Sequence, residues 1–334
     1  MEIWTQFATA SLGISLLAFA AIIIFFRVLK NESKTRNAFI NISLVIFSTS
    51  FSLLILEIIF GVFVVQSDGY GFTLSSKRWF HENWKPINSD GYRDYEHKWK
   101  PNVLFVVGDS FVAGHGIKNI DDRLSGQLAK KLGDQWSVAV LAQNGWDPIS
   151  EYNALVDHRK RPQKIVLSYY INDIESAAEA NHFHRPQLVK MPNSNIRFFT
   201  DNSYVLNWLY WRLYRGGFGD AYWNYLKQAH SDPQIWNSHE KELINIIDFS
   251  RNNGSEIVFV VWPNLNDIDE SFAFTSKVVA FLIEQEVEVI DLAKYFQNRQ
   301  PSTLVVNAMD GHPNKKANME VSELIYKRLF VGKE

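Results

Sequence analysis

Two long apolar segments open the chain. Residues 7–26 contain no charged side chain, residues 38–56 contain none either, and apolar character continues past Glu57 to residue 65. A helix of about 20 residues crosses the roughly 30 Å hydrocarbon layer of a bilayer. The pattern therefore predicts a two-helix transmembrane hairpin in residues 1–66, with two buried helices of a soluble core as the alternative. A cleaved signal peptide fits poorly, because Glu2 is the only charge before residue 7.

The connection between these helices is basic. It carries four cations and one anion: Arg27, Lys30, Lys34, Arg36 and Glu32. Loops rich in Lys and Arg stay in the cytoplasm. We therefore expect residues 31–37 to be cytoplasmic and the rest of the chain to lie across a bacterial inner membrane, in the periplasm or outside the cell. Glu57 either marks a functional contact or lies near the outer interface, where a charge costs little.

A regular α/β pattern follows a lead-in at residues 67–100, which is rich in the Gly, Asn and Asp of loops and turns. Short apolar runs occur at residues 103–107, 138–141, 165–170, 257–262 and 287–292. Helix-like stretches lie between or after them, at residues 122–132, 150–159, 238–253, 272–284 and 315–330. This alternation predicts a three-layer α/β/α domain with a parallel sheet over residues 101–334. Ligands of such sheets bind beyond the carboxyl ends of the strands.

An aromatic insert at about residues 182–236 interrupts this pattern. It holds Tyr204, Trp208, Tyr210, Trp211, Tyr214, Tyr222, Trp223, Tyr225 and Trp236. Gly216, Gly217 and Gly219 divide it into two helical halves. Two interpretations stay open: a helical hairpin packed on the domain, or a lid whose rings stack on sugars or contact the membrane interface.

Composition excludes several classes of protein. The 34 basic and 36 acidic residues give a net charge of −2, unlike a strongly basic nucleic-acid binder. The absence of cysteine removes thiolate nucleophiles, disulfides and cysteine metal sites. No Gly-x-Gly-x-x-Gly or phosphate-binding loop indicates a cofactor. His182 and His184 lack an obvious third ligand, so we expect no metal there.

Candidate chemistry follows the apolar runs in order. Ser110 stands on a tight turn after the first, Gly145 follows the second, and Asn172 follows the third. Each alone is an ordinary turn or helix-cap residue. Asp310 and His312 come just before the last helix, where a histidine can act as general base and a carboxylate can orient it. Together the set predicts a serine nucleophile, oxyanion donors and a base.

This ordered set resembles the SGNH hydrolase superfamily, also called GDSL, which is named for Ser, Gly, Asn and His in four sequence blocks. The resemblance implies a flavodoxin-like α/β/α fold, with Ser110 as nucleophile and His312 as base. It also implies an oxyanion hole formed by Ser110, Gly145 and Asn172. A bacterial subgroup with N-terminal membrane helices shares a further segment, here Asn88-Ser89-Asp90-Gly91-Tyr92-Arg93-Asp94.

Two departures from the family pattern bear on the site. Tyr170 stands where the third block usually has Gly, and Asp310 precedes His312 by two residues instead of the usual three. The shorter spacing leaves two alternatives: Asp310 orients His312 through a local adjustment of the loop, or a backbone carbonyl orients it. Among the neighbours, we expect Asp109 to bond backbone within its turn and His115 to lie on a solvent-facing loop.

The resemblance implies a membrane-anchored serine esterase or O-acyltransferase that needs no cofactor. Its substrate would be an acyl ester of an envelope glycan or a lipid. The alternative is a non-catalytic SGNH-like scaffold whose helices dock on a membrane-protein partner. Fold analogy does not choose between esterase and transferase.

Overall fold

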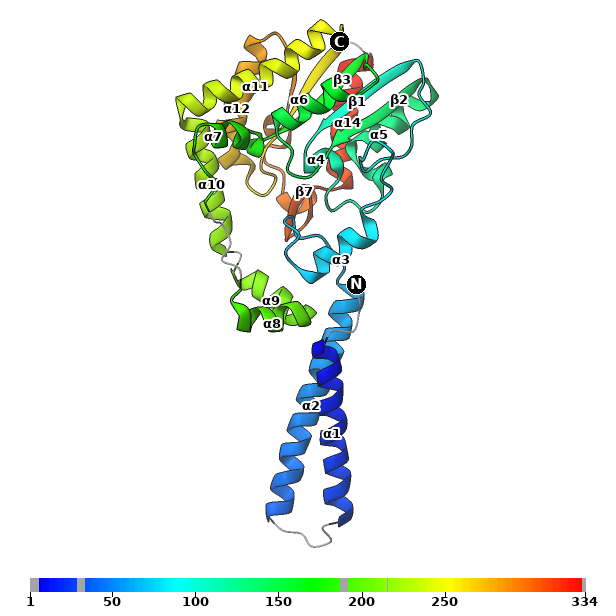
Figure 1. Cartoon of the computed structure of the whole chain (residues 1–334), viewed down its shortest axis with the longest axis vertical. Coiled ribbons are helices and arrows are strands. Elements are labelled where there is room, and N and C mark those ends of the chain that lie inside the picture. The colour runs from blue at the N-terminus through cyan, green and yellow to red at the C-terminus, as the bar shows by residue number, and fades with distance from the viewer. Residues whose placement is uncertain (1–5, 29–33, 187–191, 215, 332–334) are drawn as a thin grey trace. The chain divides into compact units, whose positions relative to one another are not determined.

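A computed structural model describes residues 6–28, 34–186, 192–214 and 216–331 (Figure 1). The chain divides into two compact units. The first comprises Met1–Ser67, Gly71–His81 and Val189–Gly217, and the second Asp68–Tyr70, Glu82–Leu188 and Phe218–Glu334. The basic connection predicted to be cytoplasmic lies largely at residues 29–33, outside the described residues.

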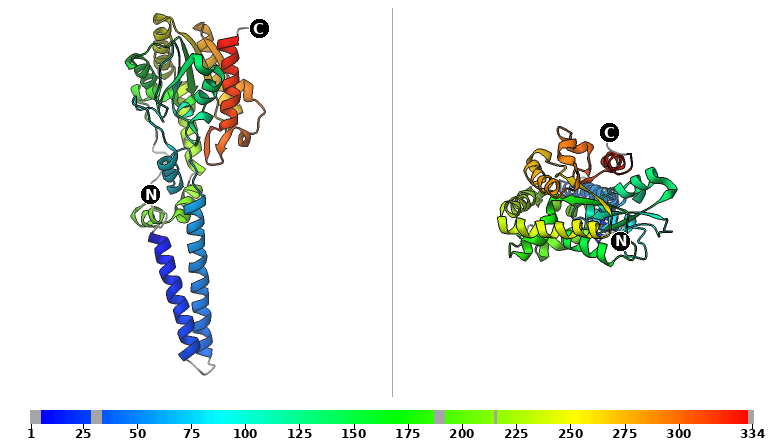
Figure 2. Two further views of the ribbon diagram at one scale, coloured as in Figure 1. Left: turned by 90° about the vertical axis from the view of Figure 1, so that its right-hand side faces the viewer. Right: turned by 90° about the horizontal axis from the view of Figure 1, so that it is seen from above.

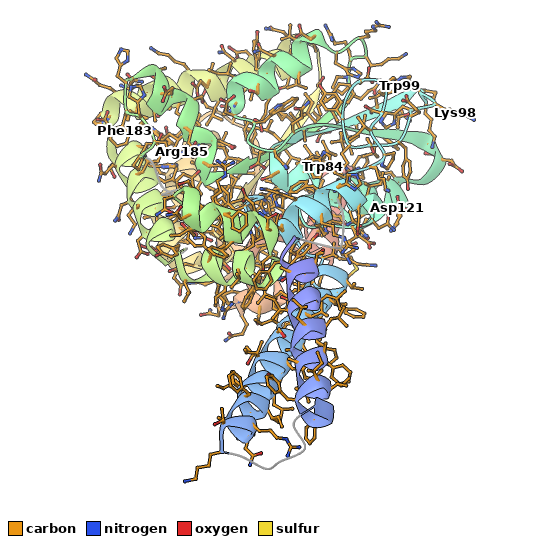
Figure 3. All side chains as sticks on the ribbon, turned by 60° about the horizontal axis from the view of Figure 1, so that its bottom comes forward. Trp84, Lys98, Trp99, Asp121, Phe183 and Arg185 are labelled. Carbon is orange, nitrogen blue, oxygen red and sulfur yellow. The ribbon has the colours of Figure 1, made fainter. Side chains whose placement is uncertain are left out.

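The first unit is built on a hairpin of α1 (Gln6–Val28) and α2 (Lys34–Phe63), both long and apolar enough to cross a membrane. Its seam is lined by small and polar residues, and Ser15 Oγ lies 2.8 Å from Ser50 Oγ across it. Large apolar side chains such as Leu17 and Val45 are exposed instead. Figure 3 draws the side chains of the hairpin as sticks that project outward from its two helices. Small residues inside and apolar residues outside are the reverse of a soluble helix pair and are typical of helices packed in lipid.

Three further helices belong wholly or largely to this unit: α3 (Leu74–Asn83), α8 (Ser194–Asn202) and α9 (Tyr204–Tyr214). Composition indicated only loops where α3 forms. The helix begins because Thr73 Oγ1 accepts the Ser76 N–H at 3.0 Å, and it is held by the buried Trp79. Among the described residues, the aromatic insert holds α8, α9 and α10 (Gly216–Ser231), where the sequence predicted two helical halves. Most of α10 lies in the second unit.

The second unit is a three-layer α/β/α domain, as predicted. Its sheet has five parallel strands in the order β2-β1-β3-β4-β5. The strands are β1 (Asn102–Gly108), β2 (Trp136–Ala142), β3 (Lys164–Tyr170), β4 (Glu256–Trp262) and β5 (Glu288–Asp291). Each matches one of the five apolar runs within a few residues.

Both faces of the sheet are covered, so each strand buries alternate residues on opposite sides. In β1, Phe105 packs into one core and Leu104 into the other. One core includes α6 (Pro148–Asp157), α7 (Glu175–Ala180), α10, α11 (Pro233–Asn252) and most of α12 (Ile268–Glu284). The other includes α4 (Ser110–Ala113), α5 (Leu124–Leu132), α13 (Leu292–Phe296) and α14 (Lys315–Tyr326). The end-on view shows the strands between these helices (Figure 2).

The strand order fixes where a ligand site can form. In the 2-1-3-4-5 arrangement the order in which the chain adds strands reverses at β1 and β3, and ligands of such sheets bind beyond the carboxyl ends of the strands at that point. Ser110 follows β1, and Asn172 lies in the 3-10 turn Ile171–Ile174 after β3. One element of this edge was not predicted: a ribbon of β6 (Val305–Asn307) and β7 (Asp310–Pro313), which pair antiparallel.

Candidate active site

Ser110 is set by a sharp turn from β1 into the short helix α4. Gly108 ends the strand, and a Cβ there would come within 2.7 Å of Val112 Cγ2, so a larger residue would displace α4. Asp109 caps the helix, because its Oδ1 accepts the Phe111 N–H at 2.9 Å. This confirms the turn role expected for Asp109. Ser110 is thereby held at the first turn of α4, at the edge where the strands end.

His312 and Asp310 reach Ser110 from the β6–β7 ribbon. His312 Nε2 lies 2.8 Å from Ser110 Oγ, and His312 Nδ1 lies 2.6 Å from Asp310 Oδ1. The same carboxylate oxygen accepts the His312 backbone N–H at 3.1 Å. The two-residue spacing works because alternate residues of a strand point to the same face. Ser110, His312 and Asp310 therefore form a connected Ser–His–Asp arrangement despite the unusual spacing.

The two other predicted oxyanion residues lie beyond the neighbouring strands. Gly145 occupies an exposed turn after β2 with φ of +77°, a conformation that favours glycine. Asn172 lies inside its 3-10 turn, and its Oδ1 has no hydrogen-bond partner among the described residues. The helix-cap alternative for Asn172 is therefore wrong. Tyr170, which replaces the usual Gly, stacks on Phe111 at 4.3 Å between ring centroids.

The sequence predicts that His115 lies on a solvent-facing loop, and this prediction is wrong. His115 is 4% exposed, and its ring stacks on His312 with centroids 4.2 Å apart and planes 2° apart. His115 Nε2 also lies 3.8 Å from Asp310 Oδ2. Burial and the neighbouring His312 lower the pKa of His115 to about 3, so its ring stays neutral. The sequence reading missed this contact because no pattern predicts which loop residue turns inward.

The segment at residues 88–94 braces the loop that carries His115. The buried Arg93 donates to the carbonyl oxygens of Gly114 and Ile117, both at 2.6 Å, and of Ala113 at 3.2 Å. Asp94 pairs with the buried Arg123 at 3.1 Å. Burial, reinforced by the nearby Arg123, lowers the pKa of Arg93 to about 9. Residues 88–94 therefore support the loop that follows Ser110.

A second cluster, the carboxyl flank of Ser110, consists of three fully buried carboxyl groups that interact electrostatically: Asp109, Glu151 and Asp173. Asp109 Oδ2 accepts from Ser110 Oγ at 3.2 Å, while both carboxyl oxygens of Glu151 lack a hydrogen-bond partner among the described residues. Burial raises the pKa of Asp109. Burial and the mutual repulsion of these groups raise the pKa values of Glu151 and Asp173 well above the usual range of carboxyl groups. The environment therefore favours their neutral, protonated forms.

Metal ligation competes with the hydrogen bonds of the site. Within the described ranges, His115, Asp310 and His312 offer ligand atoms within 4.8 Å of one another. Asp310 and His312 are already bonded to each other, and His312 also contacts Ser110. His182 and His184 have ring centroids 6.4 Å apart, and the exposed His184 contacts Glu179 at 2.9 Å.

Comparison with known proteins gives structural likeness only. No family model matches the sequence, and no curated protein matches it. The structure is similar to TesA, at 14% identity over 69% of this chain and 99% of that one, with a TM-score of 0.43. It is also similar to a member of the lipolytic protein G-D-S-L family from Veillonella parvula, at 12% identity over 69% of this chain and 99% of that one, with a TM-score of 0.41. A lipase/acylhydrolase from Enterococcus faecalis is similar at 11% identity over 68% of this chain and 95% of that one, with a TM-score of 0.40.

Proposed function

We propose that this chain is a serine ester hydrolase or acyltransferase of the SGNH (GDSL) type. One observation carries the proposal: Ser110 Oγ, His312 and Asp310 form a continuous hydrogen-bonded series with separations of 2.8 and 2.6 Å. A hydroxyl is a weak nucleophile until an adjacent base takes its proton. The series supplies that base and a carboxylate that orients it.

The mechanism follows from the atoms involved. His312 Nδ1–H donates to Asp310, which leaves the Nε2 lone pair facing Ser110 Oγ. As Ser110 Oγ bonds to the ester carbonyl carbon, its proton passes to His312 Nε2. The carbon–alkoxy bond then breaks, and the leaving oxygen takes this proton. Water or an acceptor hydroxyl next gives its proton to His312 and attacks the acyl carbon. The bond from that carbon to Ser110 Oγ then breaks, and Ser110 Oγ takes the proton back from His312.

Negative charge develops on the carbonyl oxygen during both attacks. We assign its stabilisation to the Ser110 and Gly145 backbone N–H groups and the Asn172 side-chain amide. The assignment is supported by their places after β1, β2 and β3, which end at one edge of the sheet. Donors fixed in advance at such an edge are effective because they need no reorganisation as charge develops.

We further propose that α1 and α2 anchor the chain in a bacterial inner membrane, with the α/β domain on the periplasmic or outer side. The small-residue seam and apolar exterior of the hairpin support membrane insertion, and the basic connection supports the orientation. An enzyme on that side would meet acyl esters of envelope glycans or lipids, which are the substrate class we propose.

The first test is turnover of a small activated ester, such as p-nitrophenyl acetate, by the full chain in detergent or nanodiscs. We expect hydrolysis that is lost in folded Ser110→Ala protein. Adding an acceptor sugar hydroxyl and measuring acyl-sugar against free acid separates the transferase from the hydrolase. Turnover by folded Ser110→Ala protein equal to that of the parent chain would contradict the enzyme and leave the scaffold interpretation.

A further inference from the structure

Helices α8 and α9 have more apolar surface than their own packing can bury. Every residue of α9 is apolar or aromatic except Asn207 and Arg212. One side of the helix is buried, and the opposite side leaves Leu213 70% exposed. A helix that is hydrophobic all round belongs in a protein core or in lipid. The exposed side of α9 therefore needs an apolar surrounding that this unit does not supply.

Glu57 ties this helix to α2. Its buried carboxylate accepts hydrogen bonds from Ser203 Oγ at 2.8 Å, the Tyr204 N–H at 2.6 Å and the Val205 N–H at 3.3 Å. An acceptor with negative charge at a helix N-terminus satisfies free N–H groups and complements the helix dipole. The structure thus gives Glu57 a specific contact, which caps α9.

Aromatic and polar contacts complete the attachment. Phe60 of α2 packs edge-on against Trp208 at 5.4 Å between ring centroids, and Phe72 stacks on Trp211 at 4.8 Å. Asn207 Oδ1 accepts the Leu74 N–H at 2.9 Å. Asn207 Nδ2 in turn donates to the Thr200 carbonyl of α8 at 3.0 Å. Both helices are therefore fixed beside the carboxyl end of α2, as two views show (Figures 1 and 2).

The attachment point sets the depth of α8 and α9 in a bilayer. If α2 enters the hydrocarbon layer near Phe39, about 20 residues of helix bring it out near Ile58. Glu57 then lies at the outer boundary of the hydrocarbon layer. Helices capped and packed at this level lie along the membrane interface, not above it.

The exposed side chains of the pair suit that position. Six of the eleven exposed side chains are apolar or aromatic: Ile196, Phe198, Phe199, Leu209, Leu213 and Tyr214. Arg212 is an exposed cation on α9, while Arg197 of α8 pairs with the exposed Asp201 at 3.1 Å. Interfacial helices combine an apolar face with cations that reach lipid phosphates, and Tyr favours this level of the membrane.

We propose that α8 and α9 form an interfacial helix pair, seated in the outer leaflet with their exposed apolar side against the lipid acyl chains. We assign lipid as the occupant because the exposed surface adjoins the apolar exterior of the hairpin, which faces lipid. The inference rests on the membrane hairpin of the proposed function but not on its ester chemistry.

The absence of native cysteine allows single-cysteine reporters in the full chain. We would place an environment-sensitive fluorophore at Phe199→Cys or Leu213→Cys and reconstitute the protein in phosphatidylcholine vesicles. Phosphatidylcholine spin-labelled at carbon 5 or carbon 12 of its acyl chain would serve as quencher. Because interfacial helices insert only about 5–10 Å, we expect quenching by the shallow label to exceed that by the deep label about twofold.

Two matched reporters make the outcomes distinct. Val45→Cys, on the outward-facing, 64% exposed side of α2, should be quenched more by the deep label. Ile283→Cys, which is 61% exposed on α12, should not be quenched by either. Quenching at Val45 without quenching at Leu213 would overturn the interfacial pair alone. Loss of quenching at Val45 would refute the membrane hairpin itself.

The role of Glu57 gives a second measurement. Glu57→Ala should reduce quenching at Leu213 by half or more, leave Val45 unchanged, and still permit cleavage of the small activated ester. A blue-shifted but unquenched Leu213 reporter would show that protein covers this surface, either a partner or a second copy. That result would contradict the lipid assignment.

Discussion

Each flank of Ser110 brings one ionisable group into hydrogen-bonding distance of its hydroxyl: His312 at 2.8 Å and Asp109 at 3.2 Å. The two flanks differ in the charged groups that surround these two residues. On one flank His312 is bonded to Asp310 and stacked on the neutral His115. On the other, Asp109 contacts the hydroxyl at 3.2 Å, and no cation pairs with Glu151 within the described residues. A buried carboxyl without a cation favours its neutral form. Only the imidazole flank is therefore equipped to take the Ser110 proton.

The difference shows that proximity alone does not define a base. Both flanks lie within reach of the hydroxyl, and the carboxyl flank has the larger number of acidic groups. What separates them is the partner that stabilises charge: Asp310 can balance an imidazolium on His312, while mutual repulsion opposes charge on Glu151 and Asp173. Substitutions on the two flanks should therefore have different effects.

The largest effect should come from removing the nucleophile or its base. Ser110→Ala and His312→Ala should each lower kcat for an activated ester by roughly 10⁴–10⁶-fold, and the double variant should be little worse, because the two groups act as a unit. His184→Ala, a change to an exposed loop histidine, is the matched control and should keep full activity. Additive losses in the double variant would show that the pair does not act together.

The two carboxylates nearest Ser110 should differ sharply. Asp310→Asn should cost about 10³–10⁴-fold in kcat, because an amide no longer holds the required tautomer of His312. Asp109→Asn should cost less than about tenfold, since Asn caps a helix about as well as Asp. Steady-state kinetics on both folded proteins makes the comparison. Equal losses would assign the base function to both flanks.

An intermediate effect is expected at the oxyanion site. Asn172→Ala should lower kcat by about 10²–10³-fold with little change in KM, the usual result of removing one oxyanion donor. Asn181→Ala is the control, because within the described part of the chain the Asn181 side chain donates to Ala177 and Ser238 and to no residue of the site. A loss confined to KM would instead make Asn172 a substrate-binding residue.

The smallest effect concerns stability on the carboxyl flank. Because the pKa of Glu151 is raised in the folded protein, its contribution to stability is present below the unfolded-state pKa of about 4.3 and is lost as pH rises. Glu151→Gln should therefore weaken the decline of stability between pH 5 and 9, by at most about 1.4 kcal/mol per pH unit. Chemical denaturation at several pH values measures this. Curves that stay parallel to those of the parent chain would show that Glu151 ionises in the folded protein as it does in the unfolded chain, and would contradict the raised pKa.

The part of the site built on the sheet could be read from the sequence because its geometry is periodic. A buried parallel strand needs an unbroken apolar run, and the residues that follow it share one edge, so Ser110, Gly145 and Asn172 were placed by pattern alone. His312 was found by its position before the last helix. Its hydrogen bond to Asp310 depends on β7, which has only four residues and is too short to be recognised from an apolar pattern.

The contacts that the sequence does not predict are those made by loops and by tertiary packing. His115 turns inward because Arg93, distant in sequence, holds the carbonyls around it. Glu151 looks like an ordinary helix residue until α6 packs it beside two other carboxyls. The cap of α9 by Glu57 joins residues 146 positions or more apart. No local pattern encodes such pairings, since each depends on how separate elements meet.

An activated nucleophile at Ser110 is the basis of the proposed function, and covalent labelling tests for it most directly. The full chain would be treated with a fluorophosphonate, and intact-protein and peptide mass spectrometry would locate the adduct. We predict one adduct per chain, on Ser110, absent from Ser110→Ala and formed far more slowly in His312→Ala. Folded parent protein that stays unlabelled, or that is labelled at another residue, would contradict an activated Ser110.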